Sequence, residues 1–427
     1  MQFLLLMILF LNALFFLVIN LRQSWMAWCV WRQNCSEATE VSPMLRQDAR
    51  LWPVVAVLVP AHNEERVILG CLQALDKQEY PPGKLQIWVV NDRSTDATSA
   101  IAHQFAQQSR HDIRVFDRGS DTLPGKPAAI GDVLARVDAE VVVFFDADYT
   151  PGPDLVKRLV QPFSDPQVGA TMGRVTPENT NTNVLTRLLD LERRAGYGVD
   201  QQARQILGWL PQFGGTVGGI RLSALRDVGG WYIDVLAEDT DLTYRLYLKG
   251  YRVAYLPHAA CYEESPETWE VRYRQVRRWA MGHDQCLARY AGSVWRSKII
   301  RGWAKWDALF VLTLYLYPVV NMLGLLASLI YPVFYDYPPV FIAAVPILGL
   351  FVGVGNLSNA AQIGVAAYHD QQLRALRALP LLPLSSSISS LACIDALFKL
   401  AFARLKRQRL GWDKTLRFRS ADREVRG

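Results

Sequence analysis

The sequence lacks the cysteine patterns that mark disulfide-rich or zinc-binding proteins. Its six cysteines are scattered, without a C-x-x-C pair or a His/Cys cluster at zinc-ligand spacing, so we expect reduced thiols. The G-x-x-x-x-G-K-[ST] motif is also missing, which argues against a P-loop nucleotide triphosphatase. The 427 residues contain neither internal repeats nor low-complexity linkers, and their number suits one large domain or two ordinary ones.

Charge is absent from the start of the chain. The first 21 residues carry none, and Phe3 to Ile19 is apolar apart from Asn12. About 20 apolar residues are enough to cross a bilayer. A secretory signal peptide is the alternative, but it has basic residues before its apolar run and a small-residue cleavage site after it. Here the first basic residue, Arg22, follows the run, so we expect residues 1–22 to form a retained N-terminal transmembrane helix.

Long uncharged stretches return near the end, in an expected transmembrane region over residues 306–403. Ala308 to Tyr335 and Val340 to Tyr368 are each long enough to span. The tail, 404–427, holds nine Lys/Arg against three Asp/Glu, and basic flanks tend to stay cytoplasmic. Two crossings keep this tail on the same side as the charged middle of the chain, whereas three would not. We therefore interpret the shorter, Ser-rich Leu379 to Ile394 as re-entrant or interfacial.

The formal net charge of +6 could indicate a nucleic-acid partner, but most of the excess lies beside the apolar segments. Basic residues in such places favour anionic lipid, and no nucleic-acid recognition motif appears. We expect membrane lipids as a partner and no nucleic acid.

The middle of the chain alternates short apolar runs with amphipathic stretches. The expected strands are Val54–Pro60, Leu85–Val90, Ile113–Phe116 and Val141–Phe145, and the expected helices are Glu64–Leu75, Asp96–Gln108 and Lys126–Arg136. This alternation predicts an α/β fold with a doubly wound, mostly parallel sheet. Ligands of such sheets bind at the carboxyl ends of the strands.

Polar motifs follow three of these strands. "PAHNEE" follows the first, "NDRSTD" the second and "DADYTPG" the fourth, so Asp92, Asp146 and Asp148 should meet at one edge of the sheet. Two carboxylates one residue apart suit Mg²⁺ or Mn²⁺, which usually share their ligand shell with substrate phosphates. An acidic pair at a strand end can instead cap the next helix, but three such loops in register favour a binding site.

Three further stretches carry candidate site residues. "GKPAAI" places Lys126 at a helix start, where its ammonium and the backbone N–H groups can face a diphosphate; a solvated lysine is the alternative. Gln212 to Leu225 holds four glycines, so its backbone can lie close to a ligand, although a plain loop fits too. In "LAEDTD", the residues Glu238, Asp239 and Asp241 begin a helix and can be either site residues or N-caps.

With "NDRSTD", "DAD", "AED" and "QVRRW" in this order, the chain resembles the membrane-embedded family 2 glycosyltransferases, which include cellulose, hyaluronan, chitin and poly-N-acetylglucosamine synthases. The likeness covers roughly Val54 to Tyr290 and the hydrophobic layout. It implies a GT-A fold, which is Rossmann-like, over residues 50–268, followed by interfacial amphipathic helices over residues 269–305. It also implies transfer of a sugar from a nucleotide sugar with inversion at the anomeric carbon.

The resemblance and the motifs assign roles residue by residue. The nucleotide-sugar-binding residues would be Ala61, Asn63, Glu64, Asp92, Lys126, Asp146 and Arg278. The residues facing the acceptor would be Gly214, Gly215, Thr216, Gln275 and Trp279. Asp148, with Asp146, would bind Mg²⁺ or Mn²⁺. Asp239, beside Glu238, would be the general base, and because an aspartate at its ordinary pKa near 4 is a weak base, we expect its surroundings to raise that pKa.

The chain departs from the family pattern in several places. Asn91 and Arg93 stand where many members have D-D-G, so contacts near the uridine should differ. Ala237 replaces the Thr of T-E-D and leaves the Glu–Asp pair intact. A long second N-terminal span is missing, and Gly411 to Arg417 loosely resembles tail segments that close over the nucleotide.

The helix expected over Tyr273 to Gln285 would carry Gln275, Arg278, Trp279 and Gly282 on one face, so it would be both a membrane-surface helix and a wall of the site. Trp279 would then stack on the acceptor sugar, with a lipid-interface anchor as the alternative. A membrane scaffold with an inactive transferase-like domain is disfavoured because the motifs are intact.

We predict an integral protein of the inner or plasma membrane with a cytoplasmic catalytic domain. The first expectation is processive synthesis of a β-linked polysaccharide from UDP-glucose or UDP-N-acetylglucosamine, with the growing polymer as a partner and an accessory subunit as a further candidate. The alternative is transfer of one sugar to a lipid acceptor such as a diacylglycerol or ceramide.

Overall fold

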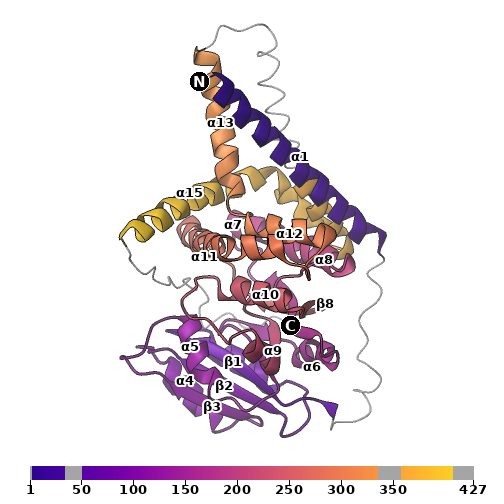
Figure 1. The fold of residues 1–427 in the computed structure, drawn as a ribbon. Coiled ribbons are helices and arrows are strands. Elements are labelled where there is room, and N and C mark those ends of the chain that lie inside the picture. The colour runs from indigo at the N-terminus through magenta and orange to yellow at the C-terminus, as the bar shows by residue number, and fades with distance from the viewer. Residues whose placement is uncertain (1, 34–50, 335–356, 407–427) are drawn as a thin grey trace.

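The computed structural model describes residues 2–33, 51–334 and 357–406. An α/β domain lies at one end of the molecule, and two long helices extend away from it at the other end (Figure 1). Most of the predicted span over Val340 to Tyr368, and almost all of the basic tail with Gly411 to Arg417, lie outside the described residues.

The domain is built on one eight-stranded sheet with the order β3-β2-β1-β4-β7-β6-β8-β5. Its strands are β1 (Val55–Ala61), β2 (Leu85–Asn91), β3 (Asp112–Asp117), β4 (Val141–Phe144), β5 (Thr150–Pro151), β6 (Val168–Pro177), β7 (Gly218–Arg221) and β8 (Arg252–Glu263). β1 pairs in parallel with β2 and β4, and β2 with β3, as the apolar runs predicted. Val55 to Val59 are fully buried, which suits a parallel sheet covered on both faces.

The second half of the sheet makes it mixed. β7 is antiparallel to both β4 and β6, whereas β6 and β8 are parallel. The short β7 begins with Gly218 and Gly219, and a Cβ on Gly218 would lie closer to the backbone oxygen of Thr171 than any real side chain allows. Glycine therefore lets β7 fit between β4 and β6. Because this strand is short and rich in glycine, it has no apolar pattern that would have predicted it from the sequence. The prediction of a mostly parallel α/β sheet of the GT-A type is confirmed.

Helices cover both faces of the sheet (Figure 1). They are α3 (Ile68–Asp76), α4 (Thr98–Ala106), α5 (Lys126–Leu134), α6 (Leu155–Val160), α7 (Val184–Ala195), α8 (Gln202–Ile206), α9 (Leu222–Asp227) and α10 (Glu238–Lys249). The first predicted helix begins four residues late, at Ile68 instead of Glu64. The backbone N–H of Asn63 donates to Ser94 Oγ in the loop after β2 (2.9 Å), and that of Glu64 donates to Thr98 Oγ1 at the start of α4 (2.7 Å). This segment therefore joins the loop after β1 to the β2–α4 connection.

The apolar ends of the chain meet in space. α1 (Gln2–Arg32) runs alongside α13 (Tyr317–Phe334), and Asn12 donates a hydrogen bond across them to the backbone oxygen of Val320 at 2.9 Å (Figure 1). Among the described residues, two helices are long and apolar enough to cross a membrane, Gln2–Arg32 and Leu373–Ala403. The first extends ten residues beyond the predicted span.

The predicted span over Ala308 to Tyr335 is not straight. Its first residues belong to α12 (Gly302–Leu312), and the axes of α12 and α13 meet at 71°. Pro318 stands at the start of α13, where its missing N–H interrupts the hydrogen-bond pattern and favours a new helix. An apolar run alone does not reveal such a bend.

Two more helices lie across the top of the domain, at a wide angle to α1 and α13 (Figure 1). α11 (Trp269–Arg296) carries the QVRRW motif, and η4 (Leu373–Leu381) leads into α15 (Leu382–Lys406), which packs on α11. The helix expected around Tyr273 to Gln285 is therefore part of a much longer one.

A buried ion cluster fastens α1 to the domain. Asp307 of α12 is paired with Arg22 of α1 at 2.7 Å and with Arg204 of α8 at 2.8 Å. Its side chain is only 2% exposed. Separating one member of a buried ion pair leaves the other charge buried and unpaired, which costs free energy. The cluster therefore holds α1 firmly against α8 and α12.

Candidate active site

A cavity of about 320 Å³ opens at the carboxyl ends of β1, β2 and β4. It is lined by all of the predicted site residues except Asn63. The predicted residues that meet there are Ala61, Glu64, Asp92, Lys126, Asp146, Asp148, Gly214, Gly215, Thr216, Glu238, Asp239, Gln275, Arg278 and Trp279. Their individual roles stay predictions. Asn63 instead accepts a hydrogen bond from the backbone N–H of Thr95 at 2.8 Å and helps join the two loops.

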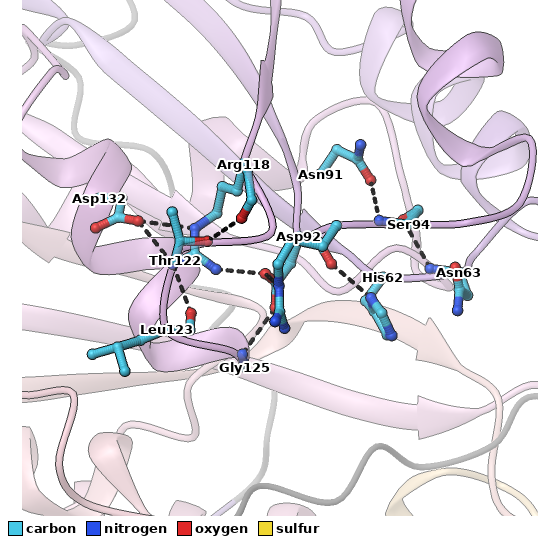
Figure 2. A network of polar contacts seen from close by, with 12 residues as sticks. His62, Asn63, Asn91, Asp92, Ser94, Arg118, Thr122, Leu123, Gly125 and Asp132 are labelled. Carbon is cyan, nitrogen blue, oxygen red and sulfur yellow. Dashed lines mark hydrogen bonds and ion pairs between the residues drawn. The ribbon is translucent and has the colours of Figure 1, made fainter.

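Asp92 is the centre of a polar network that connects three loops (Figure 2). Arg118 Nη1 donates to Asp92 Oδ1 at 2.5 Å, and the backbone N–H of Gly125 donates to Oδ2 at 2.9 Å. Burial alone would raise the pKa of Asp92, but the hydrogen bonds from Arg93 and Gly125 and the charge of Arg118 outweigh it, so the pKa is lowered. Asp92 is thus a fixed anion, held in place before any ligand binds.

Arg118 is a site-building residue that the sequence reasoning missed. Its side chain is 1% exposed, and it also donates to Asp132 Oδ2 (2.9 Å, from Nε) and to the backbone oxygen of Leu123 (2.8 Å) (Figure 2). These contacts shape the loop that leads to Gly125 and Lys126. The local sequence holds no sign of them, since the partners of Arg118 come from the end of β2, the loop after β3 and α5.

Arg93 adopts the left-handed backbone conformation, with φ of 58°. This conformation favours glycine, which explains why many family members have Gly in this motif. Here Arg93 donates from Nε to Asp92 Oδ1 at 2.9 Å. The departure noted in the sequence therefore adds a positive charge to the Asp92 network.

Lys126 faces the acidic part of the cavity. Its Nζ lies 2.6 Å from Asp146 Oδ1 and donates to the backbone oxygen of Gly215 at 3.1 Å. Burial by itself would lower the pKa of Lys126. The negative charges of Asp146, Glu238 and Asp239 raise this pKa by more than burial lowers it, so the net shift is upward and the side chain stays a charged ammonium. The predicted position of this lysine at the start of a helix is confirmed.

Asp146 and Asp148 suit a divalent cation by the chemistry of their donor atoms. Both line the cavity, and Asp148 Oδ2 accepts a hydrogen bond from the backbone N–H of Glu264 at 3.3 Å. Among the described residues, no group of three or more His, Cys, Asp or Glu is placed so that it could hold a metal ion by itself. Two carboxylates that leave further positions for phosphate oxygens and water fit Mg²⁺ or Mn²⁺.

Glu238 and Asp239 form the first turn of α10 at the cavity wall. Burial and then the charge of Asp239 raise the pKa of Glu238 to about 7, while Lys126 and Arg278 oppose this shift. Burial also raises the pKa of Asp239, against the opposing backbone hydrogen bond from Thr240 and the charges of Lys126 and Arg278. The expected upward shift of the Asp239 pKa agrees with the structure. Asp241 lies outside the cavity and is held by Arg245, Arg289 and Tyr290.

The glycine-rich loop brings backbone close to this pair. Gly215 has a φ of 71°, and a Cβ on it would lie 3.2 Å from the Cβ of Asp239. Thr216 is buried, and within the described part of the chain its Oγ1 has no hydrogen-bond partner. The loop therefore packs closely against Asp239 at the cavity, while its predicted contact with a ligand stays a prediction.

α11 forms the opposite boundary of the Glu238–Asp239 turn. A Cβ on Gly282 would lie 2.6 Å from the Cβ of Ala237 and 2.7 Å from its nitrogen, so α11 touches the segment before α10 directly. One residue later, His283 Nε2 lies 3.2 Å from the hydroxyl of Thr240, whose N–H donates to Asp239 Oδ1 at 2.6 Å. Burial lowers the pKa of His283 to about 4, so the imidazole is neutral.

The QVRRW side chains contact one residue of the same helix, Arg272, and one residue of α7, Arg193. Arg272 donates to Gln275 Oε1 at 3.0 Å, and its guanidinium carbon lies 5.3 Å from the centre of the Trp279 ring. Arg193 of α7 lies 5.6 Å from the same ring and pairs with Glu263 at 2.7 Å. Arg193 and Glu263 also line the cavity, and sequence reasoning missed both because they are distant in the chain and belong to no local motif.

Glu238 should make stability depend on pH. Because its folded-state pKa is raised from 4.5 to about 7, its contribution to stability is fully present below pH 4.5 and is lost as the pH rises to about 7. We expect Glu238→Gln to be more stable than the wild type at about pH 8, by up to about 3 kcal/mol, and to show a smaller fall in Tm between about pH 5 and about pH 8. Equal falls in Tm for the two proteins, measured by thermal unfolding, would contradict this expectation.

Known proteins are similar to this domain in sequence. The family model described as "Glycosyltransferase like family 2" matches residues 53–282, which is more than half of the chain. The chain is 34% identical over 257 residues to "Probable glycosyltransferase YdaM" of Bacillus subtilis, covering 60% of this chain and 61% of that protein. It is 33% identical over 322 residues to a "Beta-monoglucosyldiacylglycerol synthase" of Synechocystis, covering 71% of this chain and 66% of the relative. The chain thus spans slightly less than two thirds of either relative.

Among solved structures, a mannosyltransferase from Pyrobaculum calidifontis in complex with GDP-Man and Mn²⁺ has the same fold. The TM-score is 0.61 and the sequence identity 22%, and the match covers 85% of this chain and 98% of the other. Together with the family match over residues 53–282 and the cavity at the ends of β1, β2 and β4, these findings establish that the chain belongs to the family 2 glycosyltransferases.

Proposed function

We propose that this protein transfers a single sugar from a nucleotide sugar to the hydroxyl of a membrane lipid of the diacylglycerol type. The relatives named beta-monoglucosyldiacylglycerol synthases favour this alternative over the processive polysaccharide synthesis that the sequence suggested first. The observation that carries the proposal is the wall of the cavity beside Asp239. That wall is made by Trp279 and His283 of α11 and by Tyr315 in the turn between α12 and α13.

This wall connects the candidate base with the apolar helices. Tyr315 lies two residues before α13, which packs along α1, and its ring lies 4.7 Å from the ring of His283. A hydroxyl at the membrane surface can therefore approach Asp239 from the side of the lipid. Exposed tryptophans support an interfacial position, since Trp rings gather at the headgroup level. They are Trp25, Trp28, Trp31, Trp295, Trp303 and Trp306.

The donor would lie across the ends of the strands. Asp92 and its arginine partners would receive the nucleoside, and Lys126 and Arg278 would face the diphosphate and stabilise the charge that develops as it leaves. Asp146 and Asp148 would hold Mg²⁺ or Mn²⁺, which supplies further neutralisation of the diphosphate when bound.

The reaction would be a single displacement at the anomeric carbon. The acceptor oxygen forms the new bond to this carbon as the bond to the diphosphate breaks, which inverts the configuration. The acceptor proton passes to the carboxylate of Asp239, whose raised pKa makes it a better base than an ordinary aspartate. Thr240 and His283 would hold that carboxylate in position.

The product distinguishes the two functions. Full-length protein in lipid nanodiscs should be given diacylglycerol or ceramide together with radiolabelled UDP-glucose, UDP-N-acetylglucosamine or GDP-mannose. We expect one lipid-soluble product that carries one sugar and depends on the added lipid. A ladder of water-soluble polymer that forms without added lipid would overturn the proposal in favour of polysaccharide synthesis.

A further inference from the structure

The last described helix, α15, is apolar enough to cross a membrane, but it packs on a charged helix. The segment Leu373–Ala403, which contains most of α15, has a window of mean hydropathy 1.5 and is long enough to cross a bilayer. Yet α15 packs along α11, and α11 carries charge through much of its length. The charged residues of α11 include Glu270, Arg272, Arg274, Arg277, Arg278, Asp284, Arg289 and Arg296. Such a helix does not enter the hydrocarbon of a bilayer unless it lines a protein interior or water.

Polar contacts fix α15 to the α11 side of the domain. Asp395, in the middle of α15, accepts hydrogen bonds from Arg277 Nη1 at 3.1 Å and from the hydroxyl of Tyr273 at 3.2 Å. Near the start of α15, Ser385 donates to Glu192 of α7 at 2.5 Å. Because Asp395 is paired with residues of α11, the centre of α15 lies at the same level as α11.

Small apolar residues complete this docked face. Ala392, Cys393 and Ala396 of α15 are buried against Val276, Ala280 and Met281 of α11. Tyr315 and Val319, where α13 begins, pack against the same cluster. The docked face therefore reaches the point at which the chain turns into the apolar helix α13.

The opposite face of α15 is a stripe of large apolar side chains, each about half exposed or more. The stripe consists of Leu384, Leu391, Phe398, Phe402 and Leu405. Successive members are separated by seven, seven, four and three residues, which is the spacing of one helix face. This stripe runs along almost the full length of α15, from its third residue to its last but one.

We propose that α15 lies in the plane of the membrane surface, with its apolar stripe in the acyl chains of one leaflet and its docked face on α11. The sequence left re-entrant and interfacial placements open for this segment, and the contacts of Asp395 and Ser385 favour the interfacial one. The inference rests on the proposed action at a membrane lipid. It gives the enzyme a second, lateral membrane contact beside α1 and α13, directly over the helix that walls the acceptor side of the cavity.

Depth measurements along the helix test this inference. A genetically encoded keto amino acid that carries a nitroxide would replace Leu384, Leu391, Phe398 or Leu405, one at a time, in the full chain in nanodiscs; the native cysteines are left unchanged. The depth of each nitroxide follows from its collisions with oxygen and with a water-soluble nickel complex. For the in-plane helix we expect similar depths at all four positions, about 5–10 Å below the headgroups.

A spanning α15 would give a different profile, because 21 residues of helix cover about 31 Å and would carry the nitroxide through the whole bilayer. Leu4, Leu11 and Val18 on exposed positions of α1 are the matched control, and their depths should be graded. A graded profile on α15, or nitroxides that stay in water, would overturn the inference. The same preparations should also be assayed for transfer of sugar to lipid. If only the placement of α15 is wrong, transfer to lipid persists although α15 is not in the membrane plane; if the proposed function is wrong, transfer to lipid is absent.

Discussion

Replacement of Asp239 by Asn should lower the turnover number by about 10² to 10⁴, the range typical of a lost general base. The amide cannot accept the proton of the acceptor hydroxyl, yet it has nearly the size of the carboxylate and still accepts the hydrogen bond from the N–H of Thr240. Binding of the nucleotide should be little changed, because Asp92 and Arg118 hold its expected place at the other end of the cavity. Transfer of labelled sugar to lipid, with calorimetry of nucleotide binding, measures both quantities.

Asp227→Asn is the matched control for this variant. Asp227 ends α9, its side chain is 48% exposed, and its contact with Lys249 is a long 3.5 Å. The same chemical change there should leave turnover as in the wild type, because an exposed ion pair of this kind contributes little. If Asp239→Asn turned over at the rate of Asp227→Asn, the base would have to be another residue, and Glu238 is the nearest candidate.

Gly282→Ala should have the second large effect, since it adds one methyl group where α11 meets the turn that holds Glu238 and Asp239. The added Cβ would lie 2.6 Å from the Cβ of Ala237 and 3.0 Å from the carbonyl carbon of Leu236, so one of the two segments must move. Overpacking of this kind costs about 1–3 kcal/mol of stability. Because the same shift displaces the QVRRW side chains from the base, kcat/KM should fall by as much as about 10²-fold.

Gly292→Ala tests the same change in the same helix without the contact. A Cβ there meets only the mobile end of the Arg296 side chain at 3.3 Å, and alanine is the better helix former by about 1 kcal/mol. We expect this variant to be fully active and at least as stable as the wild type in thermal unfolding. Equal activity and stability of the two alanine variants would show that α11 does not depend on close approach at Gly282.

The parts of the fold that could be predicted are those with a strong local pattern. Val55–Ala61 and Leu85–Asn91 are continuous apolar runs followed by polar loops, so both the strands and the edge where Asp92 emerges could be identified. The motifs at Asp146, Asp239 and Trp279 are local too, and the cavity brings them together. Each of these features depends on neighbours in the chain.

The features that escaped prediction depend on distant partners. Arg118 looks like any basic residue at a strand end until the fold places Asp92, Asp132 and Leu123 around it. Arg193 and Glu263 are 70 residues apart in the chain, and they pair only because the fold brings this residue of α7 to the last residue of β8. The bend before α13 was hidden for a different reason, since hydropathy measures composition along a segment and not its direction.

The ion cluster of Arg22, Arg204 and Asp307 has a consequence for how an acceptor is found. It fixes the end of α1 against the domain, so the domain cannot tilt relative to α1 without leaving a buried charge unpaired. In the proposed function, Asp239 would therefore stay at a constant height above the bilayer while the protein diffuses in the plane of the membrane. A lipid acceptor would then be selected by how far its hydroxyl extends from the leaflet, since only a hydroxyl at the height of Asp239 could lose its proton to that carboxylate.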